Sequence, residues 1–294
     1  MVPKRRFAAI RVMAAEGLPV ERACALLGVL VSSCYGWMRR APSTRSIRHA
    51  WLSGIIGEVH AGSRQTYGAN RVHAELTTGR GIAVCRQTVE TLMRRAGLRG
   101  VSGRPKFRRV PNVATAADLV DRHFARAEPD RLWVTDITEH PTREGKVFCT
   151  VVLDTFSRRV VGWSIDSRPT VSMVTNALGM AIDNRSPVAG ETVIHSDQGT
   201  QFTSWAFTQP AVDSGLVPSM GSVGDCFDNA MIESFWSRMQ VKLLDRKRWH
   251  TRIELANAIF EHLEIWPNRQ RRHTSLGMLA PIEFGTRHQH RTAA

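Results

Sequence analysis

Three acidic residues, far apart along the chain, lie in local patterns that a folded protein could bring together. Asp136 lies in the middle of an apolar, β-rich run at residues 132–138. Asp197 follows a short apolar strand at residues 191–196, at a turn marked by glycine, and Glu233 lies one turn into a helix. An acid inside an apolar strand is costly to bury unless a partner or a metal compensates its charge. These three carboxylates are therefore a candidate set of metal ligands.

Carboxylate oxygens are hard ligands that suit Mg²⁺ or Mn²⁺ better than zinc. Two such ions about 3.5–4 Å apart can activate an attacking water or hydroxyl group and stabilise the leaving oxygen of a phosphodiester. Each acid also has a purely structural explanation. Asp136 could satisfy a strand end, Asp197 could shape a turn, and Glu233 could favour a helix start through the helix dipole. The spacing alone leaves both interpretations open.

The positive charge of the chain is concentrated at its N-terminal end. Residues 1–110 contain 20 Lys and Arg but only 5 Asp and Glu, a balance of +15. Residues 111–294 contain 20 basic and 21 acidic residues, a balance of −1. A basic surface made for solubility would be spread along the chain. Concentration in one segment favours a polyanionic partner, most simply double-stranded DNA.

The composition excludes several classes of protein. A length of 294 residues allows one large domain or two to three smaller ones. No apolar run approaches the ~20 residues that span a bilayer, and the basic N-terminus is not followed by a secretory signal, so no membrane partner is expected. The five cysteines are scattered without paired spacing, which supports neither a zinc site nor a disulfide framework and fits a reducing cytoplasm.

The N-terminal third reads as two helical units of the helix-turn-helix type, residues 1–42 and 43–100. A small packing bundle explains the first pattern nearly as well. The last helix of the second unit, residues 86–97, places its apolar residues on one face and Arg86, Arg94 and Arg95 away from it. Such a helix suits the major groove of DNA, although an ordinary amphipathic helix with a solvated basic face has the same pattern. Residues 101–130 read as a basic linker; the three cations expected to follow phosphates are Lys106, Arg108 and Arg109.

From residue 131 the pattern alternates between strands and helices and predicts an α/β domain at 131–285, followed by a tail at 286–294. The predicted strands are residues 131–138, 147–153, 159–165, 192–196 and 216–220, and the predicted helices are residues 170–184, 203–214, 228–247 and 251–265. Three meandering strands followed by two that alternate with helices make a mixed five-stranded sheet covered on both faces.

The chain resembles the insertion-sequence transposases of the IS-three family (the OrfB product), whose core is similar to retroviral integrases and folds like RNase H. The motifs that carry the resemblance are Trp133 to Thr138, Asp154 with Ser157-Arg158, Val161-Gly162-Trp163, His195 to Gly199, Gly224 to Ala230, Glu233-Ser234-Phe235, Asn268-Arg269, Arg272-His273, Ser275-Leu276-Gly277, Pro281 and Phe284. The 35 residues between Asp197 and Glu233 match the gap in the family's DDE motif. The resemblance covers nearly the whole chain.

The resemblance implies that Asp136, Asp197 and Glu233 are the DDE triad and bind Mg²⁺ or Mn²⁺, most simply two ions. The implied reaction is hydrolysis at the transposon 3′ end, followed by attack of that 3′-OH on target DNA, without a covalent protein–DNA intermediate. His195 adjoins Asp197 and is expected either to support the site by contact with DNA or water near the metals or to make a structural hydrogen bond. Asn229, at the start of the Glu233 helix, is a further candidate supporting residue. The implied partners are the terminal inverted repeats, target DNA, further copies of the chain on DNA and an upstream OrfA product, in the bacterial cytoplasm at the nucleoid.

One position departs from the family pattern. Members usually carry Lys or Arg seven residues after the glutamate, where this chain has Gln240, which shares the Glu233 face of a helix to within about 20°. A DNA-end contact at this position is expected to be weakened. Arg269 and Arg272 belong to a basic cluster that either faces phosphates or is simply solvated.

Two other functions stay open on the sequence. A DNA-binding remnant or regulator without catalysis would explain Gln240, and a nuclease on the same fold would cut strands without joining them. An intact set of three acids favours the strand-transfer enzyme.

Overall fold

The computed structural model describes residues 3–101, 126–197, 199–220 and 230–292. The chain divides into two compact units, residues 1–55 and 56–294, and the division falls within helix α4 (Thr44–Gly62). The linker cations Lys106, Arg108 and Arg109, as well as Asn229, lie outside the described residues.

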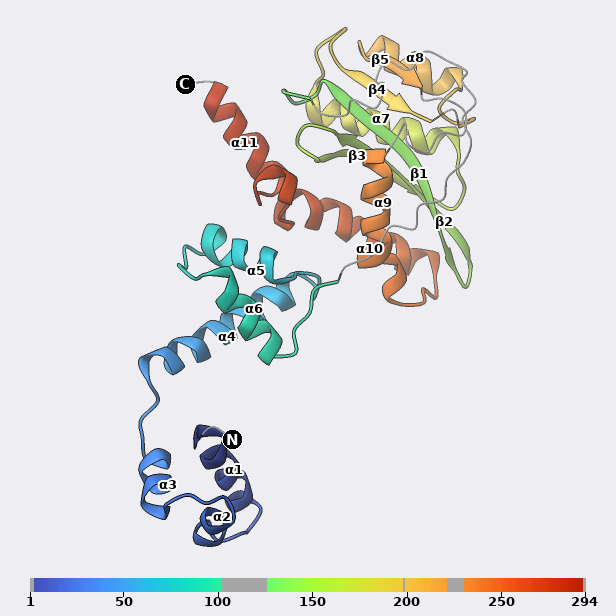
Figure 1. Cartoon of the computed structure of the whole chain (residues 1–294). Helices are drawn as coiled ribbons and strands as arrows, with labels where there is room; N and C mark the ends of the chain where they lie inside the picture. Colours follow the sequence, from blue (N-terminus) through green and yellow to red (C-terminus); the bar gives the residue numbers. More distant parts are fainter. Residues whose placement is uncertain (1–2, 102–125, 198, 221–229, 293–294) are drawn as a thin grey trace, which may run out of the picture. The chain divides into compact units, whose positions relative to one another are not determined.

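The first unit contains three short helices, α1 (Pro3–Ala15), α2 (Val20–Leu26) and α3 (Val31–Met38), together with the start of α4 (Figure 1). Its core is built from Ile10, Ala23, Cys24 and Cys34. Gly17 and Gly28 follow the first two helices with φ angles of 95° and 62°, a left-handed conformation that glycine adopts without steric cost. The first unit is therefore helical, as its sequence pattern indicates.

The second unit begins with the rest of α4, followed by α5 (Ala69–Ala74), a π-helical turn η1 (Glu75–Gly79) and α6 (Arg86–Arg95). Val89, Leu92 and Met93 on α6 are buried, which confirms the predicted apolar face of this helix.

A mixed five-stranded sheet forms the centre of the second unit (Figure 1). Its strands are β1 (Leu132–Thr142), β2 (Gly145–Asp154), β3 (Val160–Asp166), β4 (Val193–Ser196) and β5 (Val217–Met220), in the order β3-β2-β1-β4-β5. The first three strands form an antiparallel meander, and β1, β4 and β5 run parallel. The predicted mixed five-stranded sheet is confirmed. Asp154 accepts hydrogen bonds from the backbone N–H groups of Ser157 and Asp130, so this acid fixes the β2–β3 turn.

Helices cover both faces of the sheet because side chains alternate along each strand. On one face Trp133, Val152 and Ile194 pack against α7 (Val171–Arg185) and α8 (Trp205–Asp213). On the other face Leu132, Val134 and Val151 pack against α9 (Ala230–Lys242) and α10 (Arg252–Glu264). The face that carries Leu132 and Val134 also carries Asp136, so this acid is directed toward α9.

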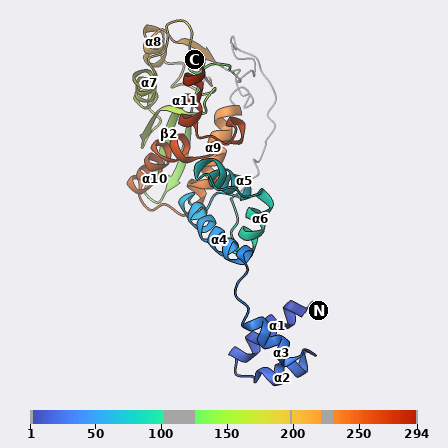
Figure 2. The same ribbon diagram turned by 90° about the vertical axis from the view of Figure 1, so that its left-hand side faces the viewer.

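The chain after α10 connects the sheet to the helices at the start of the second unit (Figure 2). This part of the chain forms η4 (Trp266–Gln270), η5 (Thr274–Leu276) and α11 (Pro281–Thr292). A short helical turn, η3 (Leu244–Arg246), lies between α9 and α10. The Tyr67 hydroxyl donates to the Gln270 carbonyl at 3.0 Å and accepts from the Arg272 backbone N–H at 2.9 Å. The sequence pattern does not predict α11, which includes most of the segment taken as a tail.

Candidate active site

Asp136 is held in the middle of β1 by two hydrogen bonds. Its Oδ1 accepts from the backbone N–H of Ile137 at 2.8 Å, and its Oδ2 accepts from the indole Nε1 of Trp236 at 3.1 Å. Burial is the largest cause that raises the pKa of Asp136 from 3.8 to about 7, and the nearby carboxylates of Asp197 and Glu233 contribute to the same rise. The ionised form of this carboxylate is therefore destabilised by its surroundings, and a positive charge bound there would reverse that effect.

Asp197 lies beside Asp136 because of the register of two parallel strands. Val134 on β1 aligns with His195 on β4, and Asp136 and Asp197 each lie two residues further along the chain in the same direction. Asp197 is exposed just past the end of β4, where its Oδ1 accepts from the Gly199 backbone N–H at 3.1 Å. Both aspartates line one cavity of about 180 Å³. The other residues that line it are Ile137, Thr138, Glu139, Phe148, Pro169, Gly199, Gln201 and Phe202.

Glu233 enters the site from α9, in the first turn of that helix. The helix is held against the sheet by Met231, Ile232 and Trp236, which belong to the core on this face. Trp236 lies three residues after Glu233, so both side chains are on adjacent parts of the helix surface and the indole contact to Asp136 brings Glu233 toward β1. The effect of Glu233 on the pKa of Asp136 reflects this proximity.

The donor set fits a hard divalent cation, because it consists of carboxylate oxygens around one buried acid. As the side chains stand, no group of three His, Cys, Asp or Glu residues within the described parts of the chain is close enough to enclose a metal ion. Three carboxylates resist close approach because like charges repel, and a divalent ion removes that opposition. The effect of Asp197 and Glu233 on the pKa of Asp136 shows that the other two acids are near it.

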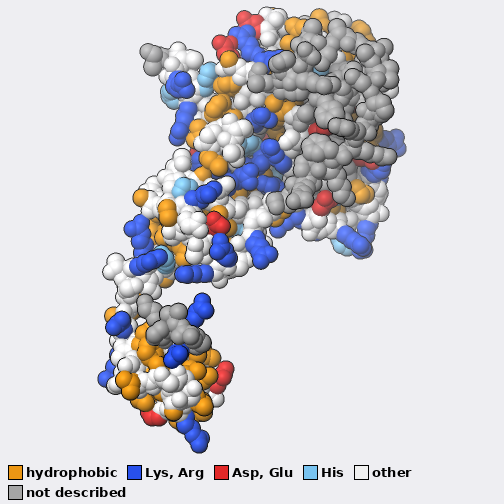
Figure 3. Space-filling view, viewed as in Figure 1, with side chains coloured by type: hydrophobic (Ala, Val, Ile, Leu, Met, Phe, Trp, Pro, Cys, Tyr) orange, Lys and Arg blue, Asp and Glu red, His pale blue; other side chains and the backbone are white. Residues whose placement is uncertain are grey.

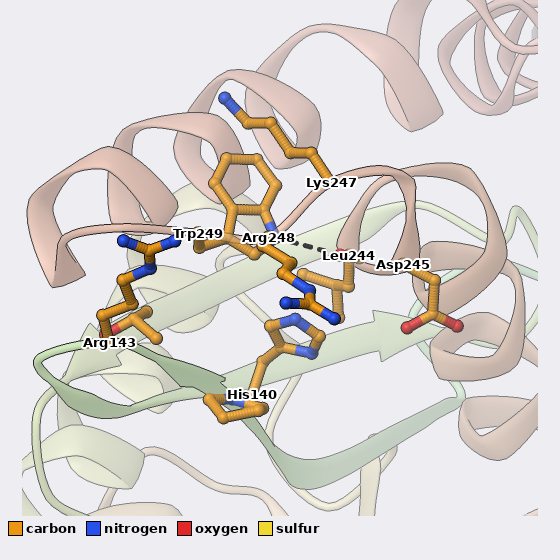
Figure 4. A pocket seen from close by; sticks show the side chains of 9 residues that line it. His140, Arg143, Leu244, Asp245, Lys247, Arg248 and Trp249 are labelled. Carbon is orange, nitrogen blue, oxygen red and sulfur yellow. Dashed lines mark hydrogen bonds between the residues drawn. The ribbon is translucent and has the colours of Figure 1, made fainter.

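His195 and Gln240, the two described residues with expected supporting or DNA-end roles, are directed elsewhere. His195 is fully buried, and its Nδ1 is 3.0 Å from the Ser219 hydroxyl on β5. Gln240 donates from Nε2 to Asp245 Oδ1 at 2.5 Å. Asp245 lines a separate cavity of about 530 Å³ with His140, Arg143 and Arg248 (Figure 4).

The predicted DNA-contacting arginines fall into two groups. Arg86, Arg94, Arg95 and Arg269 are exposed, although Arg94 pairs with Glu90 one turn away at 3.0 Å. Arg272 is only 5% exposed and forms ion pairs with Glu75 at 2.8 Å and Glu283 at 2.9 Å. The charge of Arg272 is therefore matched inside the protein, where it joins the α5–η1 region to α11.

Trp236 is the functional neighbour that the sequence interpretation missed, because it was assigned to core packing alone. It is indeed mostly buried, yet its polar edge reaches the catalytic candidate Asp136. The available signal was its position three residues after Glu233, combined with the tendency of a buried indole N–H to find an acceptor.

Comparison with known proteins places the chain in a family. Residues 126–226 and 214–281 match two models described as integrase core domain, and residues 49–106 match an HTH-like domain. A transposase for insertion sequence element IS629 from Shigella sonnei is 37% identical over 243 residues, which cover 82% of this chain and 81% of that protein. Transposase InsF for insertion sequence IS3A from Escherichia coli is 31% identical over 270 residues, which cover 90% of this chain and 93% of that protein. The chain belongs to the IS-three family of insertion-sequence transposases.

The resemblance drawn from the motifs is therefore confirmed, and this transposase has an integrase core preceded by a helical, HTH-like region. The HTH-like match includes α5 and α6, and with them the exposed arginines of α6. Among solved structures, the HTLV-2 integrase catalytic core domain in complex with magnesium aligns with 54% of this chain and 98% of that chain, at 18% identity and a TM-score of 0.41. None of the described helices has the length and apolar character needed to cross a membrane.

Proposed function

We propose that this transposase cuts and joins DNA strands at an acidic site formed by Asp136, Asp197 and Glu233. The observation that carries the proposal is Asp136 itself, a mostly buried carboxylate whose pKa is raised to about 7 by burial and then by the other two acids. A protein keeps such an unfavourable arrangement of like charges when function requires it, since perturbed acids gather at active sites.

The three acids would hold Mg²⁺ or Mn²⁺, which when bound supplies Lewis acidity toward the scissile phosphate. Asp136 and Asp197 would bind from adjacent strands, and Glu233 from the helix that packs over them. Trp236 holds one oxygen of Asp136 in place, so the other ligands converge on a fixed carboxylate.

The proposed reaction has two steps. In the first, water attacks the phosphorus at the transposon end, the bond to the 3′-oxygen breaks, and the end is left with a free 3′-OH. In the second, that 3′-OH attacks a target phosphodiester, a new phosphorus–oxygen bond forms, and the target's own 3′-oxygen leaves as a hydroxyl. The DNA partners would be the terminal repeats and the target duplex, held in part by the exposed arginines of α6.

The test is an assay of the purified chain with a labelled duplex that carries the element's own end, in the presence of Mg²⁺. Wild type is expected to give both a cleaved strand and a joined product. Asp197→Asn is expected to lose both products and keep its duplex affinity. Asp213→Asn, at an exposed acid on α8, is the matched control and should behave as wild type. Joined product from Asp197→Asn would contradict the assignment; cleavage without joining in wild type would indicate a nuclease, and binding alone a non-catalytic regulator.

A further inference from the structure

Five cations from four separate segments of the second unit form a group that we call the cationic cluster. Its members are Arg71 on α5, Arg158 in the β2–β3 turn, Arg238 and Lys242 on α9, and Arg271 after η4. Arg238 and Lys242 are four residues apart and therefore lie on one face of α9. Lys and Arg side chains gather near the middle of the face of the second unit shown in Figure 3.

The members of the cluster lie close enough to repel one another. Burial is the largest cause that lowers the pKa of Lys242 to about 7, and the charges of Arg271, Arg71 and Arg238 contribute to the same shift. Partial burial of its guanidinium lowers the pKa of Arg238 as well, and the charges of Arg158 and Arg71 contribute to the same shift. Each effect comes from desolvation or from another cation.

The two innermost cations lack acidic partners within the described residues. Lys242 is 7% exposed and its Nζ has no hydrogen-bond partner, and Arg271 is 4% exposed and its Nε has none. The Lys242 Nζ and the Arg271 Cζ lie 5.1 and 5.5 Å from the centroid of the Trp266 ring. Arg271 also donates from Nη1 to Nε2 of His273 at 3.0 Å, and burial and the nearby arginines hold the pKa of that imidazole at about 2, so it is neutral. Aromatic and imidazole contacts solvate these cations but do not neutralise them.

The next residue along the chain is equally buried and does have acidic partners. Arg272 is as buried as Arg271 but has two glutamates as partners, Glu75 and Glu283. Within the described parts of the chain no salt bridge involves any member of the cluster. A buried charge without a counter-charge is strongly unfavourable, and an anion that reaches it removes the penalty.

The position of the cluster suggests which anion binds. Arg238 is exposed, so the cluster opens to solvent at that residue and continues inward to Lys242 and Arg271. Arg71 belongs to the HTH-like region and its Nε donates to the Arg272 carbonyl at 3.0 Å, whereas Arg238 and Lys242 belong to the helix that carries Glu233. A ligand bound here would touch both the helical region and the integrase core. Arg238 lies five residues after Glu233, about 7.5 Å along the helix axis.

We propose that the cationic cluster is a phosphate-binding site, which takes a backbone phosphate of the DNA bound by the helical region and so positions that strand relative to Asp136, Asp197 and Glu233. The assignment of the ligand to DNA rests on the proposed function. A DNA backbone phosphate and free inorganic phosphate present the same oxyanion to the site, so free phosphate is the alternative ligand.

The chain offers a matched control for Lys242. Lys247 also lies over a tryptophan, with its Nζ 4.4 Å from the centroid of the Trp249 ring, and Figure 4 shows it alongside that indole. Unlike Lys242, it is exposed and bridges Glu254 at 2.6 Å. Lys242→Met and Lys247→Met make the same change of side chain over a tryptophan ring, so a difference between them reports the site and not the loss of a lysine as such.

The experiment uses the full chain without divalent metal, which separates it from catalysis. In the first arm, inorganic phosphate is compared with chloride at equal ionic strength. Phosphate is expected to raise the Tm of wild type and of Lys247→Met but not of Lys242→Met, because a ligand stabilises only the protein that binds it. An equal rise in all three proteins would overturn the site.

In the second arm, duplex affinity is measured as a function of salt. Lys242→Met is expected to bind about three- to tenfold more weakly and to lose about one unit of the salt slope, while Lys247→Met follows wild type. An unchanged slope with a lost phosphate response would assign the site to free phosphate and overturn the DNA assignment. Arg238→Gln, at the exposed edge, gives the same duplex test if Lys242→Met does not fold. If Lys242→Met loses duplex affinity but wild type does not cleave DNA, only the proposed function is refuted. If wild type cleaves DNA but Lys242→Met and Arg238→Gln bind the duplex normally, only the phosphate-binding role of the cationic cluster is refuted.

Discussion

Replacing Asp136 by asparagine is expected to abolish catalysis and yet stabilise the metal-free protein at neutral and alkaline pH. The physical reason is that the folded-state pKa of about 7 lies above the ordinary value of 3.8. The unfolded chain therefore ionises this carboxyl group more readily than the folded one. Its ionisation removes stability progressively as the pH rises from about 4 through 7.

The magnitude follows from the size of the shift. One pKa unit corresponds to about 1.4 kcal/mol, so a rise of about three units costs about 4 kcal/mol at pH 8 but less than about 2 kcal/mol at pH 5. Asparagine carries no charge, but its amide nitrogen cannot accept one of the two hydrogen bonds that Asp136 receives from Ile137 and Trp236. That loss costs about 1–2 kcal/mol. The net expectation is a gain of about 2–3 kcal/mol at pH 8 and almost none at pH 5.

The assay is urea unfolding of wild type and Asp136→Asn at both pH values in the presence of a chelator, repeated with Mg²⁺. Mg²⁺ should stabilise wild type more than the variant, because the variant has lost a ligand. A variant less stable than wild type at pH 8, or a difference that does not change with pH, would refute the account of Asp136 as a buried, repelled carboxylate.

Three further changes test the site and its supports. Trp236→Phe removes the indole donor that holds the pKa of Asp136 down, so cleavage should require about tenfold more Mg²⁺; an unchanged Mg²⁺ titration would contradict the positioning role. Arg95→Gln, at an exposed position on α6, should reduce the salt slope of duplex binding by about one without changing the Tm, and an unchanged slope would remove this residue from the DNA interface. Gly162→Ala should destabilise the protein by about 1–3 kcal/mol, because the added Cβ would lie 2.1 Å from the Ala177 carbonyl oxygen where α7 packs on β3. The measurement is the Tm, which should fall. A Tm equal to that of wild type would show that α7 can move away from β3 at little cost.

Local sequence determined the elements of this protein and the types of residue in its candidate site. The five strands and the helices that cover the sheet follow from hydrophobic periodicity, which depends only on which side chains face the core. The apolar face of α6 was predictable for the same reason. Helix α11 was not, because its sequence is rich in His and Arg and it is held by distant contacts, such as Phe284 against Phe156 and Glu283 with Arg272.

The tertiary structure decided which polar groups meet. The parallel pairing of β1 with β4 brings Asp136 and Asp197 to one cavity, and the packing of α9 gives Asp136 an indole partner from a residue 100 positions away. Arg271 and Arg272 are neighbours of the same type, yet Arg272 pairs with two glutamates and Arg271 with no acid among the residues that the structure describes. Charges interact through space over a few ångströms, whereas periodicity records only local direction along the chain. The sequence therefore shows which residues are acidic and which are basic, but only the folded structure shows which of them interact.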